Sequence, residues 1–280
     1  MKKAICIGIN NYPGTQNDLK GCVNDANNWS EFLTGLGFET SIILDKDATK
    51  KTILNSLTAM AQGSQEEDIL VFTYSGHGTQ LVDQDGDEED GYDEALYVYD
   101  GAISDDDIRW ALKAINEDSV FVVVMDSCFS GTATRVRTKG SKPKFLKTAK
   151  NLKSVPKKKL FRNQEEMKEL FLAGCSDQEY SYDAFISGQN CGAFSYYALK
   201  VLGEGLEKSY DDFYKRLREF LPSTRYPQTP QLEGSDANRN LKLFVEKQKP
   251  PPPPPIPTVD IFEAIYNFFK KIYDWIVNLF

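Results

Sequence analysis

Apolar runs typical of buried strands alternate with stretches of helical spacing along most of the chain. Runs such as 69–74 and 119–126 are continuous and rich in β-branched and aromatic residues, which predicts central strands of a sheet covered on both faces. The predicted strands are 3–9, 38–44, 69–74, 95–99, 119–126 and 169–174. The predicted helices are about 18–35, 49–61, 105–115, 192–203 and 209–220. This alternation predicts an α/β fold with a mainly parallel sheet between two layers of helices.

Chemically distinctive residues follow two of these strands. His77, the only histidine of the chain, comes directly after the strand at 69–74, and Cys128 comes directly after the strand at 119–126. Ligands and reacting groups gather at the carboxyl ends of parallel strands, so we expect the imidazole and the thiol to meet there. For either residue alone, the alternative is a buried histidine or an inert buried cysteine.

The pair predicts nucleophilic catalysis. A free cysteine thiol has a pKa of about 8.5, so a neighbouring imidazole is needed to raise the fraction of thiolate. Cys128 is therefore the expected nucleophile and His77 the expected base. The backbone N–H groups of Gly78 and Cys128 are expected to face the oxyanion that develops during the reaction. This chemistry requires no cofactor.

Five motifs resemble those of a known family. They are LKGCVNDA at 19–26, YSGHGTQ at 74–80, DEEDGYDE at 87–94, DSCFSG at 126–131 and QTPQLEG at 228–234. In this order, from about residue 3 to residue 245, the chain resembles metacaspases and their prokaryotic relatives, the orthocaspases. The resemblance implies a caspase-like three-layer α/β/α sandwich and a cysteine endopeptidase that cleaves after Arg or Lys.

The side chain that precedes the cleaved bond, P1, would enter a pocket built, by resemblance, from Cys22, Asp25, Ser75 and Asp126. A basic P1 residue needs carboxylates in its pocket. Ser75 and Asp126 each lie two residues before a catalytic residue, so the period of a strand points them the same way as that residue. For Asp25, the alternative is a carboxylate on a helix face or at a helix cap.

Acidic residues are concentrated between Asp83 and Asp107, a segment with twelve Asp or Glu and no Lys or Arg. Many metacaspases bind activating calcium, and the resemblance places ligands at Asp93, Asp105 and Asp106. Some members complete the site with a further aspartate where this chain has Arg135. A cation at a ligand position argues against calcium, which makes it a doubtful cofactor. The alternative is a solvated acidic loop that leads into a helix N-terminus.

Basic residues are concentrated between Arg135 and Arg162, a segment with twelve Lys or Arg and no Asp or Glu. It occupies the place of the loop between the two halves of a caspase-like domain. We hypothesise that the enzyme cleaves itself there, or that the uncut loop lies on the acidic loop or in the P1 cleft and keeps the zymogen closed. The named cleavage candidates are Arg135, Arg137, Lys139, Lys147, Lys159 and Arg162. Lysines without interleaved aromatic residues in an acidic protein predict no specific nucleic-acid partner.

Length and composition fit one large domain followed by a tail. The 280 residues carry a net charge of −8. The expected peptidase domain covers 1–247, with a large-subunit-like part at 1–134, the basic loop at 135–162 and a small-subunit-like part at 163–247. The five cysteines are widely spaced and odd in number, which predicts neither a disulfide framework nor a zinc site and favours a reducing cytoplasm.

The C-terminal segment is predicted to be a separate module. Residues 248–258 form a proline-rich linker of polyproline II type, and residues 259–280 have the spacing of an amphipathic helix. This helix carries too much charge for a membrane span. This helix could pack on the domain or self-associate, lie on a membrane surface, or bind a partner protein.

Together these features predict a cysteine endopeptidase that acts on peptides with a basic P1 residue. It would be a self-processing zymogen in regulated proteolysis or in a cell-death or defence response. The alternatives are a non-catalytic caspase-like scaffold and a membrane-targeted effector that acts through its C-terminal helix.

Overall fold

The computed structural model describes residues 1–82, 92–128, 140–146, 167–176, 179–247 and 270–271. The chain separates into two compact units, Met1–Lys247 and Gln248–Phe280. Within the second unit, the described residues Lys270 and Lys271 are helical and exposed. The predicted linker and the rest of the predicted C-terminal helix lie outside the described residues.

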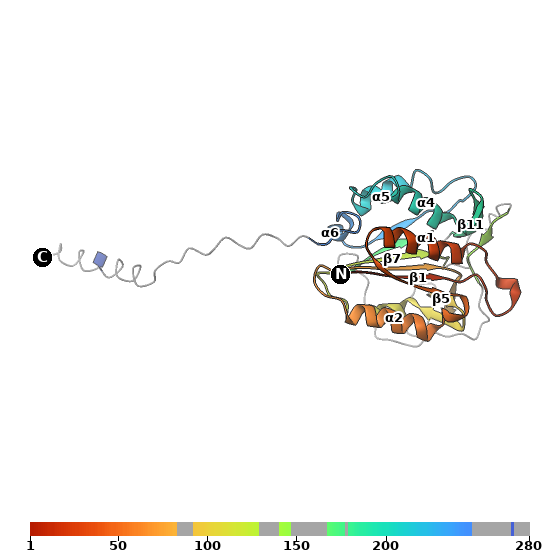
Figure 1. Ribbon diagram of the computed structural model, residues 1–280, viewed down its shortest axis with the longest axis horizontal. Coiled ribbons are helices and arrows are strands. Elements are labelled where there is room, and N and C mark those ends of the chain that lie inside the picture. Colours follow the sequence, from red (N-terminus) through yellow and green to blue (C-terminus); the bar gives the residue numbers. More distant parts are fainter. Residues whose placement is uncertain (83–91, 129–139, 147–166, 177–178, 248–269, 272–280) are drawn as a thin grey trace. The chain divides into compact units, whose positions relative to one another are not determined.

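A six-stranded sheet forms the centre of the first unit (Figure 1). In spatial order its strands are β12 (Gln231–Glu233), β9 (Glu169–Ala173), β7 (Val120–Asp126), β3 (Ile69–Ser75), β1 (Lys2–Gly8) and β2 (Glu39–Leu44). All neighbours pair in parallel except β12, which is antiparallel to β9. The predicted, mainly parallel sheet is confirmed. Because Ser75 of β3 is level with Asp126 of β7, the residues that follow both strands emerge at one edge.

Helices cover both faces of this sheet. They are α1 (Cys22–Gly35), α2 (Lys50–Gln62), α3 (Asp105–Leu112), α4 (Ala193–Leu202), α5 (Tyr210–Leu217) and the short α6 (Asp236–Arg239). Figure 1 shows α1, α4 and α5 on one side and α2 on the other. Alternate side chains of β7 supply the two cores: Val124 packs with the α1, α4 and α5 layer, and Val123 packs with the α2 and α3 layer. The structure therefore confirms the predicted α/β/α sandwich.

The first helix begins later than the expected residue 18. A short 3₁₀ turn, Thr15–Asn17, comes first, and α1 starts at Cys22. Between them, the backbone N–H groups of Lys20 and Gly21 donate to the carboxylate of Asp183 at 2.8 Å each. These bonds hold the chain in a loop up to the helix. The helices expected to reach 115 and 220 end at Leu112 and Leu217.

Two small sheets lie beside the central one, and only the strand at 95–99 was predicted for them. The first contains β4 (Gly78–Val82), β5 (Tyr92–Val98) and β6 (Gly101–Ser104), and the second contains β8 (Lys142–Pro143), β10 (Tyr182–Ile186) and β11 (Gln189–Gly192). Most of these strands are too short to show a clear period-2 pattern. No helix in the described part of the chain has the length and apolar character needed to cross a membrane.

Deleting a buried aromatic ring of the α5 layer should cost much more stability than deleting an exposed one. Phe213 is 1% exposed, whereas Phe185 on β10 is 55% exposed. We expect Phe213→Ala to lower the free energy of unfolding by about 3–5 kcal/mol and Phe185→Ala by roughly 0.5 kcal/mol or less. Urea unfolding of both variants in a Cys128→Ala background measures the difference. Equal losses would contradict the assignment of this core.

Candidate functional site

The carboxyl edge of β3 and β7 brings together the two residues predicted to be catalytic. His77 lies two residues beyond the end of β3, and Cys128 lies two residues beyond the end of β7. The backbones of Gly78 and Cys128 approach so closely that a Cβ on Gly78 would overlap the carbonyl oxygen of Cys128. Glycine is the only residue without that atom, so only glycine allows this approach.

The imidazole of His77 is fixed by backbone and aromatic contacts. Its Nε2 lies 2.7 Å from the carbonyl oxygen of Asn17, and its ring centroid is 4.9 Å from that of Tyr12. A carbonyl only accepts, so Nε2 carries the proton and Nδ1 is left as the basic nitrogen. Nδ1 is buried and has no hydrogen-bond partner among the described residues. Burial lowers the pKa of His77 to about 4, against the opposing effect of the Asn17 bond, so the ring is neutral at physiological pH.

The thiol of Cys128 is buried and faces the backbone of Ser181. The N–H of Ser181 donates to the sulfur at 2.8 Å, and the carbonyl oxygen of Ser181 lies 3.3 Å from it. Cys175, just beyond β9, lies beside it, and its pKa is raised well above the usual value by a hydrogen bond with Cys128 and by burial. In this state the sulfur bonds to Ser181 and not to Nδ1 of His77.

A lysine of the basic loop lies in the middle of the predicted pocket. The side chain of Lys144 is fully buried, and its Nζ lies 2.8 Å from Ser75 Oγ, 3.0 Å from Asp126 Oδ1 and 3.2 Å from Asp25 Oδ2. The ammonium donates hydrogen bonds to Ser75 and Asp25, and it forms an ion pair with Asp126. Burial would lower the pKa of Lys144, but Asp126, Asp25 and other nearby charges outweigh it and raise that pKa above its usual value.

The two carboxylates have further donors of their own. Gly192 N–H donates to Asp25 at 2.9 Å, and Ser195 N–H donates to Asp126 at 2.9 Å. A Cβ on Gly192 would overlap both the Asp126 carboxylate and the Lys144 ammonium. The space around the lysine therefore depends on a residue without a side chain. Its walls come from α1, β3, β7 and the junction of β11 with α4.

Cys22, the fourth predicted pocket residue, is at the same place. It is fully buried at the start of α1. Burial raises the pKa of its thiol well above the usual value, while the charge of Lys144 and a hydrogen bond with Ser75 act in the opposite direction. The structure thus gathers all four residues named from the sequence around one ammonium group.

The backbone of Lys144 occupies the space between the predicted oxyanion donors. Its carbonyl oxygen accepts from Gly78 N–H at 2.9 Å and from Cys128 N–H at 3.3 Å. Its own N–H donates to the carbonyl of Ser181 at 2.9 Å. The side chain of Lys144 is thus in the pocket while its carbonyl oxygen accepts from the two predicted oxyanion donors, as that of a bound substrate would.

Sequence reasoning did not single out Lys144. The six basic residues that it named, Arg135, Arg137, Lys139, Lys147, Lys159 and Arg162, all lie outside the described residues. A usable signal was present, because Phe145 and Leu146 form an apolar pair within a polar segment. The same signal occurs at Leu160 and Phe161, so it would not have chosen between the two places.

Gln228 explains the last of the five motifs. It is fully buried, its amide N–H₂ donates to the carbonyl of Gly174 at 2.8 Å, and its carbonyl oxygen accepts from Tyr182 N–H at 3.2 Å. It therefore connects the end of β9 to β10, beside the backbone of Ser181 that contacts the nucleophile. The motif alone did not indicate this role for Gln228.

The residues aligned with calcium ligands are otherwise engaged. Asp105 and Asp106 both pair with Arg109, Asp106 at 3.1 Å. Asp93 lies on β5 and is buried. The described residues contain no group of three or more His, Cys, Asp or Glu side chains arranged to bind a metal. Position 135 and most of the acidic segment lie outside the described residues, so the calcium site that the resemblance implies stays a prediction.

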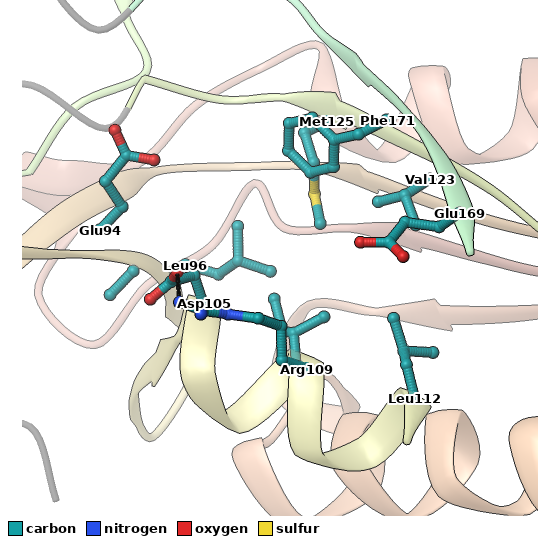
Figure 2. Close-up of a pocket in the computed structure, with 11 residues that line it drawn as sticks. Glu94, Leu96, Asp105, Arg109, Leu112, Val123, Met125, Glu169 and Phe171 are labelled. Atoms are coloured by element: carbon teal, nitrogen blue, oxygen red, sulfur yellow. Dashed lines mark hydrogen bonds and ion pairs between the residues drawn. The ribbon is translucent and has the colours of Figure 1, made fainter. Parts of the chain in front are cut away.

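A small cavity lies next to these residues, between α3 and the central sheet (Figure 2). Its volume is about 50 Å³, enough for a water molecule or two. It is lined by Glu94, Ala95, Leu96, Asp105, Ile108, Arg109, Leu112, Val123, Met125, Glu169 and Phe171. None of these residues contacts Lys144 through a hydrogen bond or ion pair that the structure shows, so the cavity is separate from the site.

Comparisons with known proteins identify relatives over most of the chain. The model of the caspase domain family matches residues 1–242. Metacaspase-1 of Scheffersomyces stipitis is 32% identical over 286 residues, a match that covers 84% of this chain and 70% of the relative. Metacaspase-1 of Cryptococcus neoformans is 32% identical over 296 residues, covering 87% of this chain and 64% of the relative, so the chain spans less than two thirds of that protein.

Solved structures share the fold. A protein from Geobacter sulfurreducens has a TM-score of 0.68 at 24% identity, covering 89% of this chain and all of that one. Caspase-1 from Spodoptera frugiperda has a TM-score of 0.55 at 13% identity, covering 89% of this chain and 91% of that one. At these identities the likeness concerns the architecture alone.

Asp25 should make the stability of the protein depend on pH. Burial raises its pKa to about 6, although Lys144 acts against the shift. Between pH 6 and 4 the folded state then binds more protons at Asp25 than the unfolded state does. The free energy of unfolding should rise as pH falls through this window, by about 3 kcal/mol for a shift of this size.

The measurement is urea unfolding at several pH values, in a Cys128→Ala background with Asp25 and with Asp25→Asn. The difference between the two proteins isolates Asp25 from His77, whose lowered pKa acts in the opposite direction. Parallel curves between pH 7 and 4 would show that Asp25 does not titrate there.

Proposed function

The chain belongs to the caspase domain family, among the metacaspases, and we propose that this cysteine peptidase cleaves after Lys or Arg and first cuts its own chain after Lys144. One observation supports both parts of the proposal. The ammonium of Lys144 lies between Asp25 and Asp126, and its carbonyl accepts from the N–H groups of Gly78 and Cys128. A P1 residue must make both contacts for its bond to be cleaved.

The reaction follows from groups around the Lys144 carbonyl. The Cys128 sulfur attacks the carbonyl carbon of Lys144, while Gly78 and Cys128 N–H groups stabilise the oxyanion. Nδ1 of His77 accepts the thiol proton and then delivers it to the departing nitrogen of Phe145. Water hydrolyses the resulting thioester and releases a carboxylate at Lys144. For the attack to begin, the sulfur has to leave its contact with Ser181.

The carbonyl of Asn17 orients the imidazole of His77, a task that a third catalytic residue often performs. The carbonyl of Asn17 accepts from Nε2, which keeps Nδ1 unprotonated and available. A carboxylate in that place would hold a positive imidazolium more strongly, whereas a carbonyl provides orientation with less charge. The proposed dyad of Cys128 and His77 therefore works with a backbone acceptor.

Preference for a basic P1 residue rests on charge. Two carboxylates within 3.2 Å of one ammonium attract a cation, and an acidic side chain in the same buried space would face two like charges. Protein and peptide substrates with Lys or Arg at P1 are the proposed partners. The residues proposed from the basic loop, Arg135 to Arg162, remain candidates for further cuts.

The proposed chemistry uses protein groups alone. All five cysteines are buried and unbridged, which supports a reducing location such as the cytoplasm. A calcium requirement stays a prediction. To test it, the self-cleavage experiment described below is run both with millimolar calcium and with a chelator. We also propose a role in regulated proteolysis, cell death or defence, because an uncut chain with Lys144 in its pocket would be an inactive form that awaits a signal.

Self-cleavage should depend on Lys144 in a defined way. We expect purified wild type and Lys144→Arg to acquire a new N-terminus at Phe145, because arginine can also pair with the two carboxylates. Lys144→Ala and Cys128→Ala should lack this terminus. Intact mass and N-terminal sequencing measure the product with time, at several protein concentrations.

A cut within one chain should have a half-time independent of concentration, because the Lys144 carbonyl already accepts from the Cys128 N–H of the same chain. Cleavage at Phe145 in the Cys128→Ala protein would overturn the proposed nucleophile. If wild type is never cut and cleaves no basic peptide in either calcium arm, the non-catalytic scaffold becomes the better interpretation.

Filling the pocket should abolish cleavage of basic peptides. The Cβ of Gly192→Ala would occupy the place of a P1 ammonium beside Asp126, so we expect kcat/KM for Lys-P1 peptides to fall at least a hundredfold. Gly35→Ala is the matched control, because a Cβ there meets no atom within 4 Å. Circular dichroism and urea unfolding check that both variants fold. Full activity of a folded Gly192→Ala protein would contradict the position of the pocket.

A further inference from the structure

Residues 142–146 cross the site as an extended segment with backbone contacts on both sides of Lys144. On the N-terminal side, Pro143 of β8 pairs with Tyr182 of β10 in an antiparallel ladder. On the C-terminal side, Leu146 N–H donates to the carbonyl of Gly78 at 2.9 Å. The hydroxyl of Thr79 donates to the carbonyl of Leu146 at 2.7 Å. These contacts fix an extended backbone but select no side chain.

Two side chains other than Lys144 also make contacts that would distinguish one substrate from another. The ammonium of Lys142 donates to the carbonyl oxygens of Asp18 at 2.7 Å and Gln16 at 3.1 Å. These oxygens lie in the 3₁₀ turn and loop that precede α1. Carbonyl oxygens accept hydrogen bonds and carry partial negative charge, so they favour a cation and disfavour a carboxylate.

The residue after Lys144 contacts an aromatic ring. Phe145 is half-buried, and its ring centroid lies 6.3 Å from that of Tyr180 at an interplanar angle of 41°. Tyr180 is itself 9% exposed and packs in a cluster that includes Cys128 and Cys175. The surface next to the cleaved bond is therefore a fixed aromatic ring close to the nucleophile.

We propose that the peptidase recognises a side chain on each side of the basic P1 residue: a cation two positions before it, bound by the carbonyls of Gln16 and Asp18, and an aromatic residue directly after the cleaved bond, packed on Tyr180. This proposal rests on the proposed function, with residues 142–146 bound as a substrate would be. It defines the substrate class as basic, any residue, basic, then aromatic. Tyr180 is then a specificity-determining residue.

The test uses internally quenched peptides that extend three residues beyond the cleaved bond, because reporters that replace the residue after P1 cannot reveal this contact. All peptides have Lys at P1. They differ in Phe, Ser or Asp directly after it, and in Lys, Ala or Glu two positions before it. Pairs of peptides compete in one tube, and mass spectrometry gives the ratio of their kcat/KM values. Such a ratio is independent of the fraction of active enzyme.

With the full chain we expect Phe to be preferred over Ser by roughly three- to tenfold, the range typical of aromatic pairs. Tyr180→Phe should keep this preference because it keeps the ring, and Tyr180→Ala should reduce it to within about twofold. Two positions before P1, Lys should be preferred over Glu by at least threefold in all three proteins, because its acceptors are backbone atoms.

Equal rates for Phe and Ser in wild type, or a preference that persists in Tyr180→Ala, would overturn the role of Tyr180. Equal rates for Lys and Glu would overturn the role of the carbonyl pair. In either case cleavage after Lys would continue, and the proposed function would stand. Failure of every Lys-P1 peptide would instead contradict the proposed function itself.

Discussion

The buried ammonium of Lys144 between Asp25 and Asp126 is the interaction on which the site depends. Two carboxylates this close inside a protein repel each other unless a cation or a proton lies with them. Removing one partner of a buried ion pair typically costs about 3–5 kcal/mol. The charge balance therefore connects α1, which carries Asp25, to the end of β7, which carries Asp126. The basic loop is part of this balance in the uncut chain.

Burial shifts the pKa values of Asp25 and His77 in opposite directions. It raises the pKa of Asp25 and lowers that of His77, because in both cases it disfavours the charged form. The neutral form of His77 is the one that the proposed mechanism uses as a base. For Asp25 the charged form is the useful one, and Lys144 helps to maintain it. Burial thus favours the neutral form of His77 directly, whereas the charged form of Asp25 depends on a cation in the pocket.

The sequence predicted β1, β3 and β7 well because each contains a continuous apolar run whose alternate residues supply two different cores. It also placed His77, Gly78 and Cys128 together, since residues after neighbouring parallel strands share an edge. The small strands were missed because a two- to five-residue strand has little period to detect. The start of α1 was misplaced because Asp183, more than 160 residues away, holds the preceding loop.

Contacts made through the backbone left no trace in the sequence. Any residue at position 17 provides a carbonyl for His77, and any residue except proline at position 181 provides the N–H that donates to the sulfur of Cys128. The residue type of Lys144 does not distinguish it from the other lysines of the loop. The composition of the loop therefore indicated that a basic residue of the loop could enter the pocket, but not which one.

The antiparallel pairing of β8 with β10 has a consequence for what a single cut achieves. The ion pairs of Lys144, the contacts of Lys142 and the β8 ladder all belong to the part of the chain before the proposed cleavage point. Cleavage removes none of them. The new C-terminus stays attached to the same domain at a high effective concentration and acts as a tethered competitive product. Activity on other substrates would then require dissociation of that end, and strong pairing of β8 would make this step slower than hydrolysis.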